Sequence, residues 1–468
     1  MLSQQELAKL SCPHPGEISG YWPWSLTRNE EGELTFPTAT VSELAQTYGT
    51  PLFVVDEDDL AGKAEVWISA MSEACWDGYG MNGATVSYAA KAFMCGSIVK
   101  LMNQHGLSID TASLAELECA IRAGAKPEQI GLHGNAKSDA ELRRAVDFGI
   151  DHIFVDSPAE AERISQIAAE LGKVARVMIR VTTGVHAGGH EFIATAHEDQ
   201  KFGVSLATGA AFDLGQKISN DPNLDFRGLH SHIGSQINSL EAFEQGALKL
   251  LGLRSQFLAA GIDIPTLDLG GGYPIRYLPT DPQPLTPREI ADTLAKTVRE
   301  YCQSRNEDIP HLQVEPGRSL AGPTAITLYR VVGIKRVTIA EGQYRDYVAV
   351  DGGMSDNIRP ALYGANYTAL LANRVGSSEL TYARVVGKHC ESGDILIPEI
   401  ALPADLKPGD ILAMPATGAY GRSMASNYNM ALKPGVVAAS RDGVKVWLRP
   451  ETITDLFALD PALAEVEK

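Results

Sequence analysis

The chain lacks the cysteine patterns that build metal sites and redox sites. Its six cysteines are spread over 468 residues, and no two of them form a C-x-x-C pair. Zinc sites and dithiol motifs use such pairs, so the sequence predicts no metal site and no redox motif. Six cysteines are also too few for a chain of this length to be a disulfide-dense secreted scaffold.

Membrane segments and an excess of positive charge are missing as well. The sequence has no apolar run of about 18 residues, and its N-terminus shows no basic stretch followed by an apolar one. The 58 acidic residues outnumber the 40 Lys and Arg, which gives a formal net charge of −18. Nucleic acids and anionic membranes attract clustered Lys and Arg, so neither is an expected partner. We therefore expect an enzyme of the cytoplasm.

The sequence instead contains a regular alternation that begins near residue 84. Short apolar runs alternate with longer segments of helical period, in a composition of 44% hydrophobic and 21% charged residues that is ordinary for a globular protein. Eight runs are candidate strands: Ala84–Ala90, Gly106–Asp110, Ile130–His133, His152–Val155, Arg176–Val181, Phe226–Ser231, Pro265–Leu269 and His311–Glu315. Such alternation predicts parallel βα units, and eight of them over about 230 residues match a TIM-like (β/α)₈ barrel in an α/β protein. An open doubly wound sheet is the alternative.

Local signals predict where the intervening helices begin and end. Ser113 and Ser138 each stand three residues before a Glu, which is typical of a capping box at a helix N-terminus. Gly124, Gly149 and Gly172 fall where the helices are expected to end.

After about residue 320 the pattern changes to strands joined by turns. The candidate strands are Thr327–Val337, Tyr347–Val350, Tyr382–Val386, Asp394–Ile397, Asp410–Met414 and Val436–Val446. We predict an all-β domain of sandwich or barrel-like form, to which Pro51–Val55 could add a strand. The predicted division is an N-terminal segment joining the β domain (1–50), the barrel (51–320) and the C-terminal β domain (321–468).

Polar and glycine-rich motifs follow four of the eight barrel strands. Lys91 follows the first strand and His232 the sixth, Gly270–Gly272 follow the seventh, and Glu315 closes the eighth. In a (β/α)₈ barrel these positions are the C-terminal strand ends, where active sites form. An open sheet would not gather them, so their convergence favours the barrel.

These residue types suggest pyridoxal 5′-phosphate. Adjacent glycines let backbone N–H groups approach a phosphate, and Ser235 and Arg318 could add further donors. Lys91 could form a Schiff base, Glu315 could keep a ring nitrogen protonated, and His232 could stack on the ring. Taken singly, a tight turn, a surface ion pair, a structural lysine and a core histidine remain alternatives.

The motifs resemble those of the fold type III, alanine-racemase-like decarboxylases that use pyridoxal phosphate, and among them the diaminopimelate decarboxylases. The matching segments are Tyr88–Ala92, His232–Gln236, Gly270–Gly272, Glu315–Arg318, Asp351–Met354, Arg359–Tyr363, Cys390–Asp394, Gly418–Gly421 and Ser426–Asn429. They span roughly residues 50 to 440 in the order of the family, whereas Gly184–His190 matches only loosely.

The resemblance implies a role for each matching residue. Lys91 carries the cofactor, and Cys390 is the acid that returns a proton after CO₂ leaves. Cofactor contacts are implied for Lys91, His232, Ser235, Gly270, Gly271, Gly272, Glu315, Gly317, Arg318 and Tyr420. Substrate contacts are implied for Arg318, Arg359, Tyr363, Glu391 and Tyr420. In the family Cys390 would come from the other subunit of a homodimer. A free cysteine is usually a buried hydrophobe, but Cys390 stands in a polar, turn-like segment.

The implied reaction is decarboxylation of meso-2,6-diaminopimelate to L-lysine and CO₂, the last step of lysine biosynthesis. Arg359 and Tyr363 suit the distal carboxylate of this substrate, and Glu391 suits its distal ammonium. A decarboxylase of ornithine, arginine or lysine is an alternative that would need only acidic distal contacts. An inactive regulatory homologue and a racemase are further alternatives, against which Lys91 and Cys390 argue.

Overall fold

The computed structural model describes residues 2–18, 20–185 and 201–463. Most of the loosely matching segment Gly184–His190 lies outside the described residues. The chain divides into two compact units. The barrel unit is Ala61–Pro274 with Pro284–Ser319, and the β unit is Met1–Leu60 with Ile275–Gln283 and Leu320–Lys468. Within the described ranges, no helix is long and apolar enough to cross a membrane.

The barrel unit is built on a closed parallel sheet. Its strands are β5 (Ala84–Ala89), β6 (Ser108–Thr111), β7 (Ile130–Leu132), β8 (His152–Val155), β9 (Ala175–Thr182), β11 (Leu224–His230), β12 (Thr266–Asp268) and β13 (His311–Val314). Each strand pairs with the next one along the chain, and β13 pairs with β5 to close the ring. The (β/α)₈ barrel is therefore confirmed and the open sheet is excluded. A short strand, β10 (Val204–Ser205), adds to one end of β9.

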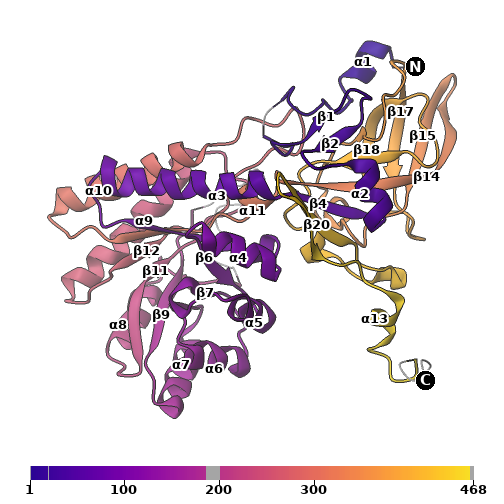
Figure 1. Cartoon of the computed structure of the whole chain (residues 1–468). Helices are drawn as coiled ribbons and strands as arrows, with labels where there is room; N and C mark the ends of the chain where they lie inside the picture. The colour runs from indigo at the N-terminus through magenta and orange to yellow at the C-terminus, as the bar shows by residue number, and fades with distance from the viewer. Residues whose placement is uncertain (1, 19, 186–200, 464–468) are drawn as a thin grey trace. The chain divides into compact units, whose positions relative to one another are not determined.

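Helices connect successive barrel strands and lie outside them (Figure 1). They are α4 (Gly96–Gln104), α5 (Leu114–Ala123), α6 (Asp139–Phe148), α7 (Pro158–Leu171), α8 (Ala210–Ser219), α9 (Leu240–Ala259) and α10 (Pro287–Arg305). Before β5 stand α3 (Glu57–Ser72) and a π-helical turn (Glu73–Gly78), and α11 (Arg318–Ala321) follows β13.

The expected helix ends are largely as predicted. Ser138 and Glu141 form a complete capping box, and left-handed glycines end α5, α6 and α7 at Gly124, Gly149 and Gly172. At α5 the box is altered, because the carboxylate of Glu116 accepts from the N–H of Ala112 instead of Ser113. Local hydrogen bonding alone thus fixes these helix boundaries, as the spacing of Ser and Glu predicted.

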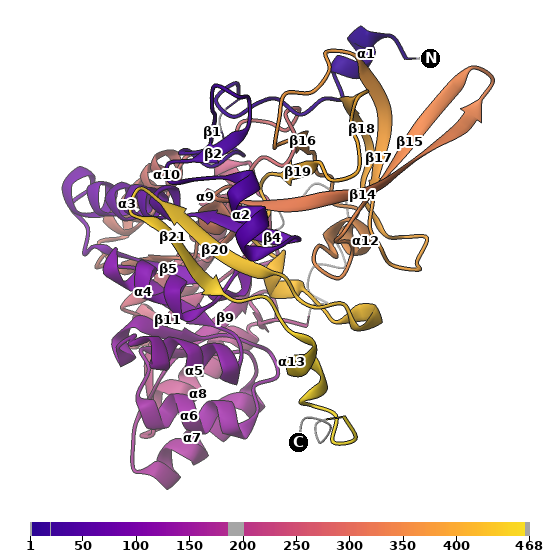
Figure 2. The same ribbon diagram turned by 45° about the vertical axis from the view of Figure 1, so that its right-hand side comes forward.

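The β unit contains a large sheet to which the N-terminal region contributes. Its strands are β4 (Leu52–Asp56), β14 (Ala325–Ala340), β15 (Gln343–Val350), β16 (Leu370–Leu371), β17 (Leu380–Val386), β18 (Ile395–Pro403), β19 (Ile411–Met414), β20 (Gly435–Ser440) and β21 (Gly443–Leu448). β4 lies between β14 and β20, so the predicted addition of this segment to the β domain is confirmed. Figure 2 shows β14 and β15 as a long twisted ribbon.

Smaller elements complete the β unit. A second sheet consists of β1 (Thr27–Arg28), β2 (Leu34–Phe36) and β3 (Ala39–Thr40), and the helices are α1 (Gln4–Ala8), α2 (Val41–Tyr48), α12 (Arg359–Tyr363) and α13 (Ile453–Phe457). All four of these helices are short, at eight residues or fewer.

Two expected boundaries differ from the structure. The barrel range of 51–320 expected from the sequence includes residues 52–56 and 275–283, but these residues group with the β unit because β4 pairs there and Ile275 joins its core. The single strand expected at Val436–Val446 is a hairpin. The turn of this hairpin lies between Ser440 and Gly443. In it, Arg441 N–H donates to the carboxylate of Asp58, and Gly443 adopts φ +121°.

Candidate active site

The carboxyl ends of neighbouring strands bring the predicted barrel residues together. β11, β12, β13 and β5 are consecutive in the sheet, because ring closure places the first strand beside the eighth. Lys91, His232 and Glu315 all line one cavity of about 360 Å³. Cofactor and small-molecule sites occupy about 300–1,000 Å³, so the cavity has the size of a binding site.

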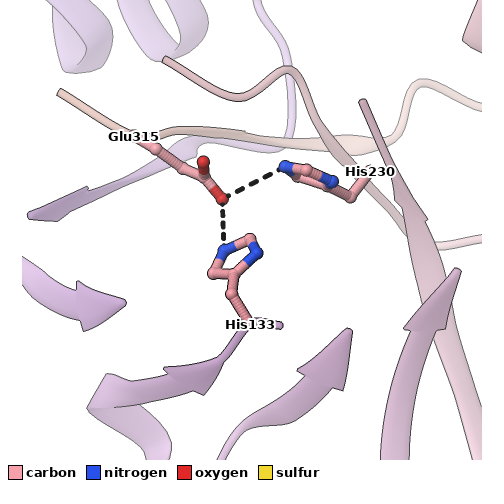
Figure 3. A group of neighbouring side chains, drawn as sticks. All are labelled: His133, His230 and Glu315. Carbon is pink, nitrogen blue, oxygen red and sulfur yellow. Dashed lines mark ion pairs between the residues drawn. The ribbon is translucent and has the colours of Figure 1, made fainter. Parts of the chain in front are cut away.

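Glu315, directly after β13, carries the negative charge of this cavity. Its Oε1 lies 2.7 Å from Nε2 of His133 and 3.3 Å from Nε2 of His230 (Figure 3). Burial alone would raise the pKa of Glu315, but the two histidines lower that pKa well below its usual value. Glu315 is therefore a carboxylate inside the barrel.

His232 presents a neutral ring to the same cavity. The backbone N–H of Gly271 donates to its Nδ1 over 3.3 Å, so the ring proton is on Nε2. Burial and the charge of Lys91 lower the pKa of His232 well below 6.5. Lys91 itself stands in the single turn that follows β5, and its Nζ forms no hydrogen bond or ion pair with any residue that the structure describes. The amine is thus available to react.

The glycine segment after β12 lets neighbouring loops approach closely. A Cβ at Gly271 would lie 2.2 Å from the carbonyl oxygen of Glu315, and a Cβ at Gly272 would lie 2.2 Å from that of Gly234. Both clashes are with backbone, which cannot swing aside. The glycines are therefore required for the packing of the loops that carry His232 and Glu315.

Two of the three glycine amides are already engaged within the protein. Gly270 N–H donates to Asp268 over 2.8 Å, and Gly271 N–H donates to His232. Of the three amides predicted to bind phosphate, the N–H of Gly272 forms no hydrogen bond within the described part of the chain.

The predicted phosphate donors outside the glycine segment lie together. Nη2 of Arg318 donates to Oγ of Ser235 over 3.1 Å, which joins the loops after β13 and β11. Gly317, beside Arg318, approaches the end of β5 so closely that a Cβ would lie 2.9 Å from the carbonyl oxygen of Ala89. Hydroxyl and guanidinium donors thus occupy one side of the barrel end.

Replacing Gly271 by alanine is expected to destabilise the protein by about 1–3 kcal/mol, because the methyl group must displace the backbone of Glu315. Cofactor affinity should fall with it. The matched control is Gly252→Ala in α9, where a Cβ meets nothing within 4 Å and helix propensity should raise stability by up to about 1 kcal/mol. Urea unfolding of both variants tests this, and equal midpoints would contradict it.

Several polar residues beyond the predicted site residues also line the cavity. They are Asp110, Thr111, His133, Arg180 and His230. Asp110 and His133 were the last residues of expected strands, and a polar residue that ends an apolar run is the signal that could have identified them. His230 lies in the expected strand Phe226–Ser231, two residues before His232. Arg180 lies inside β9 and had no such signal.

Three buried carboxyl groups in the barrel differ in their charge. Burial and the negative charge of Glu315 raise the pKa values of Asp110 and Asp268 well above the usual range. The pKa of Glu315 is shifted in the opposite direction. Environments that push the pKa values of neighbouring acids apart suit them to different roles, and here the shifts favour the ionised form at Glu315 and the protonated form at Asp110 and Asp268.

Acidification is expected to destabilise the protein below pH 6.5. Burial lowers the pKa of His133 from 6.5 to about 3, so the unfolded chain binds a proton between these values that the folded chain does not. Each pH unit in this window then costs about 1.4 kcal/mol, or about 2 kcal/mol at pH 5. Urea unfolding at pH 7.5 and pH 5 should show a smaller loss for His133→Gln than for the natural chain. An identical loss would contradict the assignment.

The other predicted residues belong to the β unit. They are Arg359, Tyr363, Cys390, Glu391 and Tyr420. Arg359 is buried, its guanidinium lies 4.7 Å from the ring centre of Tyr277, and Nη1 donates to the hydroxyl of Tyr367. Tyr363 ends the same helix and is 64% exposed. The guanidinium is therefore held rigidly between aromatic rings, one turn away from a free tyrosine.

Cys390 differs from the other cysteines in being exposed. Four of the six are buried and Cys119 is half-buried. The loop that carries Cys390 is fixed by the buried carboxylate of Asp394, which accepts from the N–H groups of His389 (2.8 Å) and Met354 (2.6 Å). The structure thus presents a thiol on a well-anchored loop, as a reactive position requires.

Comparison with known proteins links the chain to enzymes of one kind. Residues 71–322 match the family model described as pyridoxal-dependent decarboxylase, pyridoxal binding domain. A diaminopimelate decarboxylase of Mycobacterium tuberculosis is 45% identical over 445 residues, which cover 94% of this chain and 97% of the relative. A diaminopimelate decarboxylase of Bacillus subtilis is 39% identical and covers 92% of this chain and 96% of its own length.

Solved structures agree with this similarity. Diaminopimelate decarboxylase from M. jannaschii, in a complex with L-lysine, has a TM-score of 0.86 and 30% identity, and covers 94% of this chain and 99% of its own. The lysine/ornithine decarboxylase of Vibrio vulnificus has a TM-score of 0.68 at 23% identity over 85% of this chain and 96% of its own, so the likeness is one of fold.

Proposed function

Because this chain belongs to the diaminopimelate decarboxylase family of pyridoxal-dependent decarboxylases, we propose that it converts meso-2,6-diaminopimelate to L-lysine and CO₂. The observation that carries this function is the convergence of Lys91, His232 and Glu315 in one cavity. The reaction is the one implied by the motifs, and it stands at the end of lysine biosynthesis.

The cavity fits pyridoxal 5′-phosphate. Among the described residues, both carboxyl oxygens of Asp110 are buried without a hydrogen-bond partner. Leaving such atoms unpaired costs about 1–3 kcal/mol each, so the cavity is suited to receive a polar group. When bound, the cofactor supplies an electron sink for the electron pair left by the departing carboxylate.

The chain's own residues would hold and activate this group. Nζ of Lys91 would form the covalent link, and Glu315 would keep a proton on the ring nitrogen. The neutral ring of His232 would stack on the cofactor ring. Ser235 and Arg318 would bind the phosphate together with the N–H of Gly272. Burial of this site strengthens each of these electrostatic contacts because little water screens them.

Substrate recognition belongs to the residues of the β unit. Arg359 and Tyr363 bind the distal carboxylate, and Glu391 pairs with the distal ammonium. Support comes from the rigid placement of Arg359 and the exposure of Tyr363 and Glu391. Tyr420 adds a contact to cofactor and substrate.

We further propose that the active unit is a homodimer with shared sites. Cys390 of one subunit returns a proton to the carbon that has lost its carboxylate at the site formed by Lys91 of the other. The exposure of Cys390 on its anchored loop supports this role. A cytoplasmic location stays a prediction.

A substrate panel tests the function. Purified protein with pyridoxal phosphate is offered meso-diaminopimelate, ornithine, arginine and lysine, and the release of CO₂ is measured. We expect turnover of diaminopimelate alone, with one lysine formed for each CO₂. Turnover of ornithine, arginine or lysine instead would replace the substrate assignment and leave the cofactor site intact. Failure to bind the cofactor at all would favour an inactive regulatory homologue.

A further inference from the structure

Two histidines outside the predicted site converge on a single oxygen of Glu315. Figure 3 shows both rings pointing at Oε1, while the second carboxyl oxygen is turned away from them. His133 follows β7 and His230 ends β11, so the contact joins three strands of the barrel. The side chain of His230 is fully buried and that of His133 is 14% exposed.

Aromatic packing holds both rings in place. The ring of Phe154 on β8 stacks on His133 with centroids 3.6 Å apart, and it meets His230 edge to face at 4.8 Å. The two imidazoles lie 5.0 Å apart in an edge-on arrangement. Neither ring can therefore turn away from Glu315 without disturbing this packing.

A metal ion is the other group that such a cluster could hold. The three ligand atoms lie within 4.8 Å of one another, which a cation could bridge. Ligands bound tetrahedrally at about 2.0–2.2 Å from zinc are roughly 3.3–3.5 Å apart. The 2.7 Å between Glu315 and His133 is too short for two ligands of one ion and suits a donor facing an acceptor.

A carboxylate in a barrel interior needs such donors. Removing an ion from water costs several kcal/mol unless partners compensate. Neutral imidazoles can donate their Nε2–H toward Oε1 without adding a second buried charge. Both rings contact Oε1, and the second oxygen is turned away from them.

We propose that His133 and His230 are positioning residues that hold Oε1 of Glu315 and thereby present its second oxygen, ionised, to the ring nitrogen of the cofactor. The inference deepens the proposed function and rests on the pairing of Glu315 with that nitrogen. Neither histidine touches the reacting atoms.

Cofactor affinity tests the proposal without using activity. The apoprotein is titrated with pyridoxal phosphate and with its analogue in which the ring nitrogen is replaced by CH. A charge-assisted hydrogen bond should make the natural chain prefer the nitrogen compound by roughly 10- to 100-fold. Glu315→Gln should abolish the preference. His133→Leu and His230→Leu should each remove most of it, and His133→Gln, which keeps an N–H donor, should restore part.

The matched control is His152→Leu. His152 is a buried histidine that also packs on Phe154, with ring centroids 4.5 Å apart, but its Nδ1 faces Asp151. Its replacement should lower stability and leave the preference unchanged. Should His133→Leu not fold, His133→Gln and His230→Gln take its place, each expected to show an intermediate preference.

The outcomes separate the two claims. If the natural chain does not prefer the nitrogen compound, or if Glu315→Gln keeps the preference, the pairing of Glu315 with the ring nitrogen is wrong, and only a failure to bind either compound would overturn the cofactor assignment. If Glu315→Gln behaves as expected while the histidine variants keep the full preference, the positioning role alone is overturned. If the histidine variants bind both compounds more weakly by the same factor, the histidines contribute only to packing, and the positioning role is overturned as well.

Discussion

Lys91→Ala is expected to fold normally and to lose decarboxylase activity by on the order of 10⁴-fold or more. Lys91 lies in the cavity with His232 and Glu315, and its amine is the nucleophile positioned to bind a cofactor carbonyl. Without that amine the cofactor is held only by its phosphate and ring contacts. The variant should therefore release it on gel filtration, and its characteristic absorbance should disappear from the protein fraction.

Reduction with borohydride distinguishes this from a general loss of binding. Reduced natural protein should gain the mass of the cofactor on the peptide that contains Lys91, whereas Lys91→Ala should gain none. Lys100→Ala is the control, because Lys100 is an exposed lysine on α4 whose loss removes the same charge. Turnover by Lys91→Ala, or attachment of the cofactor to a lysine other than Lys91, would show that Lys91 is not the residue that binds the cofactor.

The barrel could be predicted because its strands are local features of the sequence. Apolar runs such as Ile130–His133 are bounded by turn and capping residues, and the structure places β7 at Ile130–Leu132. Strand order followed from the βα alternation, since such units pair side by side. In a closed barrel the first strand lies beside the eighth, so the motifs after strands one, six, seven and eight are expected at the same end of the barrel and close together.

Contacts between distant segments could not be predicted in the same way. The sequence indicated that this segment could add a strand to the β domain, but nothing local in Leu52–Asp56 tells that the strand lies between β14 and β20. The pairing of Glu315 with His133 and His230 depends on the relative heights of three strand ends. A periodic pattern in the sequence predicts that a strand exists. The relative heights of the strand ends depend on the register in which the strands pair, which the pattern does not contain.

The hairpin of β20 and β21 shows a different limit. The segment looks like one long strand, since Val436–Val446 is mostly apolar. The reversal lies at Asp442-Gly443, a turn signal that interrupts the apolar run and that the expectation of a single strand overlooked. The carboxylate of Asp58, which lies far away in the sequence, adds a contact by accepting from Arg441 N–H, and this contact leaves no signal at the turn.

Cys390→Ala is expected to bind the cofactor as the natural chain does and to turn over about 10²- to 10⁴-fold more slowly, the range for losing a general acid. The thiol is exposed on a loop that Asp394 anchors, so its removal should leave the fold intact. Cys119→Ala, which removes a half-buried thiol from α5, is the control and should keep full activity. A natural rate in Cys390→Ala would refute the role as proton donor.

Mixing the two inactive variants tests whether sites are shared between subunits. If Cys390 serves the partner's site, a dimer of one Lys91→Ala chain and one Cys390→Ala chain carries both defects in one site and none in the other. Random pairing should then restore roughly a quarter of the natural activity. If each chain instead completes its own site, every site in every dimer keeps one defect. The mixture would then stay as inactive as its parents, and the shared arrangement would have to be abandoned even though both residues are essential.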